Sequence, residues 1–194
     1  MPKLLVFAGP NGSGKSTVTS PALVIGDYIN ADLIKRHLGC KDLEAAEIAE
    51  NTREYCLARG NDFTFETVLS TPRNICLMQK AKESGYYIIC VYVLTCNPQI
   101  NVKRVQTRVA AGGHGVSTDK IVSRDKRALQ LFPKLLDICN ELYVFDNSVD
   151  SAKSGAEIIL QSDNGETSLY PTSLWNKEMI ESLIRGDFVE KYID

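Results

Sequence analysis

The chain of 194 residues lacks a strong net charge, a long hydrophobic run and any cluster of metal-ligating residues. Its formal net charge is −2 at pH 7, so the charge balance does not favour nucleic acid or an anionic membrane surface as a partner. The longest apolar run, residues 86–94, is too short to cross a bilayer. We therefore expect neither a nucleic-acid partner nor a membrane-spanning segment.

The sequence also lacks the cysteine and histidine spacing of a metal site. The six cysteines are scattered without a C-x-x-C pair, and only two histidines are present, so the spacing typical of a zinc site is missing. Such isolated thiols are typical of reduced cysteines in a cytosolic protein. The N-terminal segment is a strand-length apolar run followed by glycines, a pattern unlike a signal peptide. We expect a cytoplasmic protein.

Strand-length apolar segments alternate with segments of helical period, which indicates a parallel sheet covered by helices. Val91–Leu94 is apolar at successive positions, as expected for a central strand buried on both faces. We predict an α/β fold of three layers, in which helices flank a central, mainly parallel five-stranded sheet. The expected strands are Lys3–Ala8, Tyr28–Asn30, Asp62–Val68, Tyr86–Thr95 and Leu142–Phe145.

The alternating pattern covers residues 1–150, which we expect to form one domain. Beyond them the pattern weakens: Ala156–Leu160 could be a strand, residues 163–165 a turn, and Leu174–Ile184 a helix. We expect residues 151–194 to be a C-terminal extension packed on the same domain. Near the other end, Pro21 indicates that a helix beginning at Lys15 is short or kinked.

A complete phosphate-binding loop follows the first expected strand. Residues 9–16 match the pattern G-x-x-x-x-G-K-S/T, and the glycines allow successive N–H groups to point inward around an anion. Lys15 is expected to reach the β- and γ-phosphates of a nucleoside triphosphate, and Ser16 to ligate Mg²⁺. The residues expected to surround the nucleotide are Gly9, Pro10, Asn11, Gly12, Ser13, Gly14, Lys15, Ser16 and Thr17.

Two further polar clusters follow expected strands, where ligands of parallel sheets gather. After the second strand, Asp32 could accept a proton from an attacking hydroxyl or help to hold Mg²⁺. Alternatively, Asn30 or Asp32 could cap the following helix. After the third strand, Glu66 could bind a substrate hydroxyl, supply a carboxylate near Mg²⁺, or be an ordinary exposed acid.

Basic residues surround the glycine-rich turn at residues 111–115. Glycines between two basic segments are typical of a flexible cover, whose arginines could neutralise charge in a transition state. A solvated basic face is the alternative, whereas an RNA-binding patch fits less well because no aromatic residues interleave the charges. The basic residues are Lys103, Arg104, Arg108, His114, Lys120, Arg124, Lys126 and Arg127.

Taken in order, these motifs resemble those of the zeta-toxin family of P-loop kinases, whose members include UDP-N-acetylglucosamine kinases. The resemblance implies a P-loop kinase-like fold and an ATP- and Mg²⁺-dependent transfer of the γ-phosphate to a hydroxyl. The segments that carry it are residues 9–17 (GPNGSGKST), 28–32 (YINAD), 65–69 (FETVL), 104–115 (RVQTRVAAGGHG) and 145–148 (FDNS). The last segment often passes the nucleotide base in small kinases, although an Asx turn is equally consistent with its sequence.

The resemblance also implies residue roles. Asp32 would be the base, with Lys15 and Arg108 as the other catalytic residues, and Arg104, Arg108 and Arg124 would contact the ATP phosphates. It further implies a UDP-N-acetyl-amino sugar as acceptor and an antitoxin as a protein partner. Another acceptor (an antibiotic, a sugar or a nucleotide) and an NTP-dependent regulatory module are the alternatives. The candidate substrate-binding residues are Asn30, Asp32, Glu66 and Thr67.

Overall fold

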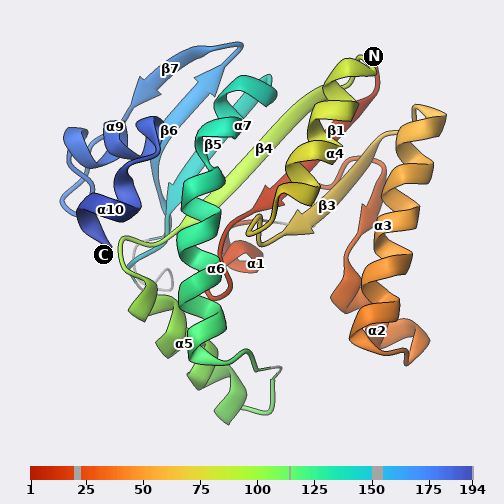
Figure 1. Cartoon of the computed structure of the whole chain (residues 1–194), viewed down its shortest axis with the longest axis horizontal. Coiled ribbons are helices and arrows are strands. Elements are labelled where there is room, and N and C mark those ends of the chain that lie inside the picture. Colours follow the sequence, from red (N-terminus) through yellow and green to blue (C-terminus); the bar gives the residue numbers. More distant parts are fainter. Residues whose placement is uncertain (20–22, 114, 150–154, 194) are drawn as a thin grey trace.

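The computed structural model describes residues 1–19, 23–113, 115–149 and 155–193. Their strands form one seven-stranded sheet in the order β2-β3-β1-β4-β5-β6-β7 (Figure 1). The five strands expected from the sequence are its parallel strands, which confirms the α/β class, although the sheet has seven strands rather than five. These are β1 (Lys3–Ala8), β2 (Asp27–Ile29), β3 (Phe63–Thr67), β4 (Tyr87–Leu94) and β5 (Glu141–Asp146).

The two additional strands form a hairpin. β6 (Glu157–Asp163) pairs antiparallel with β5, and β7 (Glu166–Leu169) pairs antiparallel with β6. Asn164 and Gly165 connect them with positive φ angles of 48° and 91°, a conformation that suits Asn-Gly in a two-residue hairpin turn. The side chains of β7 are mostly exposed, so no apolar run in the sequence indicated this strand.

The described residues include nine helices. Pro133 is the first residue of α7 and therefore separates it from α6. The helix after the phosphate-binding loop has only four residues, whereas Pro21 lies outside the described residues. The helices are α1 (Lys15–Val18), α2 (Ala31–Leu38), α3 (Asp42–Arg59), α4 (Pro72–Glu83), α5 (Pro98–Ala110), α6 (Thr118–Leu131), α7 (Pro133–Ile138), α9 (Lys177–Arg185) and α10 (Phe188–Tyr192).

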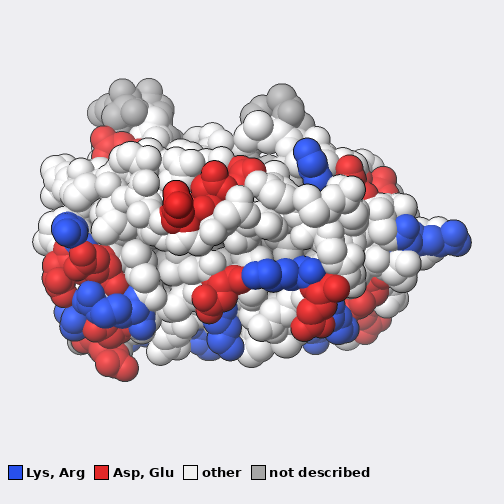
Figure 2. All heavy atoms as spheres, turned by 90° about the horizontal axis from the view of Figure 1, so that it is seen from above, with Lys and Arg blue, Asp and Glu red and all other residues white. Residues whose placement is uncertain are grey.

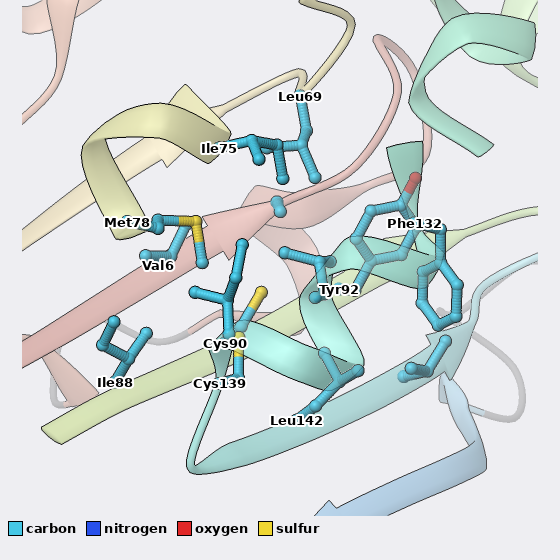
Figure 3. Packing of buried hydrophobic residues seen from close by; sticks show 14 of the residues in the cluster. Val6, Leu69, Ile75, Met78, Ile88, Cys90, Tyr92, Phe132, Cys139 and Leu142 are labelled. Carbon is cyan, nitrogen blue, oxygen red and sulfur yellow. The ribbon is translucent and has the colours of Figure 1, made fainter. Parts of the chain in front are cut away.

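The main hydrophobic core lies between the sheet and the helices in front of it in Figure 1. Val6, Cys90 and Leu142 of three neighbouring strands belong to this core together with Met78 of α4 (Figure 3). Phe132, at the junction of α6 and α7, contacts Tyr92 of β4 edge to face, with ring centroids 5.1 Å apart. This packing fixes α6 over the carboxyl-terminal half of β4.

The C-terminal residues contribute to the same core. Trp175 is fully buried and stacks on Phe188 of α10, with ring centroids 5.0 Å apart. Both belong to the hydrophobic cluster that contains Leu160 of β6 and the central strands. The expected domain boundary at residue 150 lies outside the described residues.

The other face of the sheet borders a cavity of about 610 Å³. Of the helices in the described residues, only α1 contributes side chains to its lining. The sequence predicts a central strand covered on both faces; among the described residues, this face has less helical cover than the first. The strand residues in the lining are Leu5, Phe7, Ile89, Val91, Tyr143 and Phe145.

Charged side chains of both signs are interspersed on the face shown in Figure 2, in keeping with the small net charge. Within the described ranges, no helix combines the length and the hydropathy needed to cross a membrane.

Candidate active site

The phosphate-binding loop joins β1 to α1 and depends on its glycines. Gly9, Gly12 and Gly14 have φ angles of 139°, 85° and 88°. A Cβ atom on Gly9 would lie 2.0 Å from the backbone oxygen of Val93, and one on Gly12 would lie 2.5 Å from that of Asn101. Only glycine therefore allows the loop to approach β4 and α5 this closely.

Asn147, just after β5, fixes the loop from another side. Its Nδ2 donates a hydrogen bond to the backbone oxygen of Ser13, 2.8 Å away, and would clash at 2.0 Å with a Cβ atom on Gly14. Asp146 Oδ1 accepts from the backbone N–H of Ser148 at 3.1 Å, which is the Asx turn considered from the sequence. Asn147 belongs to the segment FDNS at the end of a predicted parallel strand, but the sequence alone does not indicate its contact with the loop.

Lys15 folds back over the loop. Its Nζ donates to the backbone oxygens of Gly9, at 2.7 Å, and Pro10, at 3.1 Å. These two carbonyl groups hold the ammonium group beside the loop. A polyphosphate would offer it stronger, charged acceptors in their place.

Charged groups from three other elements act on the Lys15 ammonium. Burial lowers its pKa to about 8, while Glu66 and Asp32 raise this pKa and Arg108 lowers it. The four residues lie on α1, β3, α2 and α5. The fold therefore brings the expected phosphate-binding lysine, both candidate carboxylates and one cover arginine into one electrostatic neighbourhood.

The cap of α2 is Asn30. Its Oδ1 accepts from the backbone N–H groups of Asp32, at 2.9 Å, and Leu33, at 3.2 Å. The structure thus assigns the capping alternative to Asn30, while Asp32 occupies the exposed first turn of the helix. The Asp32 carboxylate is not used as a cap.

Glu66 is held by Tyr28, for which the sequence alone predicts no role of its own. The hydroxyl of Tyr28, in β2, donates to Glu66 Oε1, and Asn30 Nδ2 donates to the Tyr28 hydroxyl at 3.3 Å. Burial and the hydrogen bond to Glu66 raise the pKa of Tyr28 to about 12. Tyr28 therefore remains a neutral donor at physiological pH.

Thr67, a candidate substrate-binding residue, makes hydrogen bonds within the protein through its hydroxyl and its backbone. Its buried Oγ1 accepts from the backbone N–H of Leu69, at 2.9 Å, and from Nδ2 of Asn74, at 2.8 Å. Its backbone oxygen accepts from the N–H of Gly9 at 3.2 Å. Thr67 thus ties the turn after β3 to the phosphate-binding loop.

Two of the cover arginines bind backbone carbonyl groups. Arg104 donates to the oxygens of Ser148, at 3.5 Å, and Val149, at 3.2 Å, so it links α5 to the segment after β5. Arg127 Nε donates to the oxygen of Ser70 at 3.2 Å. Both contacts connect the cover to strand ends that border the loop.

Arg108 lies nearer the loop, where its charge acts on Lys15. A Cβ atom on Gly113 would lie 2.7 Å from Arg108 Cγ, so glycine allows the turn to fold against this side chain. Arg124 is half-buried on α6. His114 lies outside the described residues.

Several solved structures share the fold of this chain. The chain matches the AvrRxo1-ORF1:-ORF2 complex with a TM-score of 0.70 and 15% identity, over 98% of this chain and 66% of the other. For the complex with ATP, the TM-score is 0.67 and the identity 15%, over 95% of this chain and 64% of the other. For the PezAT toxin–antitoxin system of Streptococcus pneumoniae, the TM-score is 0.57 and the identity 16%, over 98% of this chain and 88% of the other. The chain thus spans just under two thirds of the AvrRxo1 chains, and these likenesses show the shared P-loop kinase-like fold.

Sequence comparisons are consistent with this fold. An uncharacterized protein of Haemophilus influenzae (strain ATCC 51907 / DSM 11121 / KW20 / Rd) is 29% identical over 128 residues, which are 63% of this chain and 91% of that protein. The zeta toxin family model matches residues 35–174, a range that begins after the phosphate-binding loop and includes Glu66 and Arg108. On this match, the chain belongs to the zeta-toxin family.

Proposed function

We propose that the chain is an ATP-dependent kinase that transfers the γ-phosphate to a hydroxyl group of a small molecule. One observation carries the proposal: Lys15 folds over the phosphate-binding loop, with its Nζ 2.7 Å from the backbone oxygen of Gly9, and Asp32, Glu66 and Arg108 act on its charge there. Membership of the zeta-toxin family supports it, as does a shared fold with a protein whose structure contains ATP.

The roles follow from the charges. The loop N–H groups and Lys15 bind the phosphates, and Arg108 neutralises charge that develops during transfer. The acceptor oxygen attacks the γ-phosphorus, the bond from that phosphorus to the β,γ-bridging oxygen breaks, and Asp32 takes the hydroxyl proton. Glu66 orients the acceptor, and ADP leaves with the bridging oxygen.

Magnesium fits the available donors. Among the described residues there is no group of three or more His, Cys, Asp or Glu side chains able to hold a metal ion by themselves. Mg²⁺ is commonly bound by one or two protein oxygens together with substrate phosphates and water, so exposed Ser16 would hold it, with Asp32 or Glu66 contributing directly or through water. When bound, Mg²⁺ would neutralise phosphate charge.

We propose a UDP-N-acetyl-amino sugar as the acceptor. Asp32 and Glu66 both act on the charge of Lys15, and two such carboxylates could bind two hydroxyls of a sugar and present one oxygen to the γ-phosphate, which supports this proposal. An antitoxin is the proposed protein partner, since the PezAT fold relative is a toxin–antitoxin system. The six free cysteines favour a cytoplasmic location, where ATP is available.

The test is incubation with Mg·ATP and a panel of UDP-sugars, free sugars, nucleotides and aminoglycosides, followed by mass spectrometry for a gain of one phosphoryl group. Asp32→Asn serves as the inactive control. Phosphorylation of a different alcohol alone would replace the UDP-sugar and retain the kinase. ATP binding with no phosphoryl transfer to any acceptor would favour a regulatory module instead.

A further inference from the structure

A continuous set of hydrogen bonds connects the two candidate carboxylate residues. The Tyr28 hydroxyl donates to Glu66 Oε1 and accepts from Asn30 Nδ2 at 3.3 Å. Through its Oδ1, Asn30 also accepts from the backbone N–H of Asp32 at 2.9 Å. Glu66 on β3 is thereby connected to the helical turn that carries Asp32.

Tyr28 does not have the surroundings of a core residue. It lies on the edge strand β2, is 37% exposed and is outside the hydrophobic clusters of the described residues. Its hydroxyl is protonated at neutral pH, as that of an ordinary tyrosine is, and burial and the hydrogen bond to Glu66 raise its pKa further, to about 12. The hydroxyl can therefore act as a permanent donor to the Glu66 carboxylate.

We propose that Tyr28 is a positioning residue for the phosphate acceptor. By binding Oε1, it fixes the rotation of the Glu66 carboxylate and leaves Oε2 to receive one O–H or N–H group of the acceptor. Asp32 engages the hydroxyl that is phosphorylated, so the acceptor carries a second donor beside that hydroxyl, as a vicinal diol or a hydroxyl next to an amide does. This inference rests on the proposed kinase function.

The first test is Tyr28→Phe, which keeps the ring and removes the hydroxyl. The KM for the acceptor should rise by roughly 10-fold or more, because a hydrogen bond to a charged group is lost, while the KM for ATP should stay within about twofold. Tyr87→Phe is the matched control. Its hydroxyl donates to Glu141 Oε1 at 2.7 Å at the opposite, amino-terminal ends of the strands, and its removal should leave both constants unchanged.

A double-mutant cycle separates direct coupling from a general loss of stability. In a Glu66→Gln background, Tyr28→Phe should change the acceptor KM by less than about twofold, because the charged partner has already been removed. Equal effects of Tyr28→Phe in the wild-type and Glu66→Gln backgrounds would overturn the inference. So would an acceptor KM in Tyr28→Phe no different from that of Tyr87→Phe.

A second readout does not depend on catalysis. With tyrosines labelled by ¹³C at Cζ, the Tyr28 signal is identified by its loss in Tyr28→Phe. It should shift in Glu66→Gln and remain in place in Glu141→Gln. A Tyr28 signal that does not respond to Glu66→Gln would overturn the inference even if the enzyme is active. A wild-type protein that phosphorylates no acceptor would instead overturn the proposed function. In that case this spectrum would still decide whether Tyr28 pairs with Glu66.

Discussion

The side-chain amide of Asn147 donates a hydrogen bond to the backbone oxygen of Ser13 at 2.8 Å, between residues 134 positions apart in sequence. Both residues are buried, and neither Asn147 Oδ1 nor Ser13 Oγ has a hydrogen-bond partner among the described residues. The segment after β5 therefore fixes the phosphate-binding loop from the side opposite β3.

Replacing Asn147 with alanine should loosen the loop. A buried carbonyl group left without its donor costs about 1–3 kcal/mol, so ATP should bind roughly 10-fold more weakly and the melting temperature should fall. Isothermal titration with a non-hydrolysable ATP analogue measures the affinity. Asn61→Ala, in the exposed connection before β3, is the control, and an unchanged affinity in Asn147→Ala would contradict the bracing role.

The parallel part of the sheet could be predicted because β1 and β4 are continuous apolar runs, and because the shorter strand-length segments alternate with segments of helical period. The phosphate-binding loop could be predicted because its chemistry lies in eight consecutive residues. The hairpin strand β7 could not, because exposed polar side chains leave no periodic signal.

Contacts between distant residues were also beyond prediction. Tyr28 and Glu66 are 38 positions apart, and nothing in either local sequence indicates that β2 and β3 lie side by side. The sequence left capping open between Asn30 and Asp32, which only the backbone geometry of α2 separates. Likewise, the binding of Arg104 to backbone carbonyl groups depends on the position of α5 relative to the end of β5.

ATP binding should take up protons in mildly alkaline solution. The pKa of Lys15 in the free protein is about 8, and a bound triphosphate would raise it by placing negative charge beside the ammonium group. Proton uptake should therefore be large near pH 8.5 and small near pH 6.5, where Lys15 is already charged. Titration calorimetry in buffers of different ionisation enthalpy measures this uptake.

Lys15→Ala is the matching variant for this experiment. It should abolish the uptake at pH 8.5 and remove phosphoryl transfer, since no backbone donor replaces the charge of the ammonium group in the transition state. Tight ATP binding with normal turnover in this variant would show that Lys15 does not contact the phosphates.

Asp32→Asn should lower turnover by roughly 10²–10⁴-fold while ATP affinity is retained, the usual range for a positioned base. The helix should stay intact, because Asn30 rather than Asp32 caps it. Asn30→Ala should instead destabilise the protein by about 0.5–2 kcal/mol. Steady-state kinetics and urea unfolding of both variants check the assignment, and near-normal turnover in Asp32→Asn would exclude it as the base.

The two cover arginines of α5 should behave differently. Arg108→Ala should reduce turnover more than ATP affinity, because its charge acts at the loop where phosphate charge redistributes. Arg104→Ala should chiefly lower the melting temperature, because Arg104 anchors the backbone after β5. Kinetics, calorimetry and thermal unfolding distinguish them. Equal losses of affinity and turnover in Arg108→Ala would indicate simple attraction of the nucleotide.

Asp125 on α6 is a buried acid with an unusual environment. It is 2% exposed, and its Oδ2 has no hydrogen-bond partner among the described residues. Burial raises its pKa from 3.8 to about 7. The hydroxyl of Tyr92 is likewise buried without a partner, and burial, with the charge of Asp125, raises its pKa.

Asp125→Asn should therefore stabilise the protein in a pH-dependent way. As the pH rises from 4 to 7, the unfolded chain releases the Asp125 proton before the folded chain does. Asp125 therefore lowers the free energy of unfolding over that interval, and this destabilisation reaches its full size above pH 7. Asparagine keeps the size and removes the charge, so the variant should be more stable by roughly 2–4 kcal/mol at pH 8 and nearly equal at pH 4. Urea unfolding at both pH values measures the difference. A variant less stable than the wild type at pH 8 would mean that the ionised carboxylate has a hydrogen-bond partner in the folded protein. An equal gain in the free energy of unfolding at both pH values would mean that the effect is one of packing rather than charge.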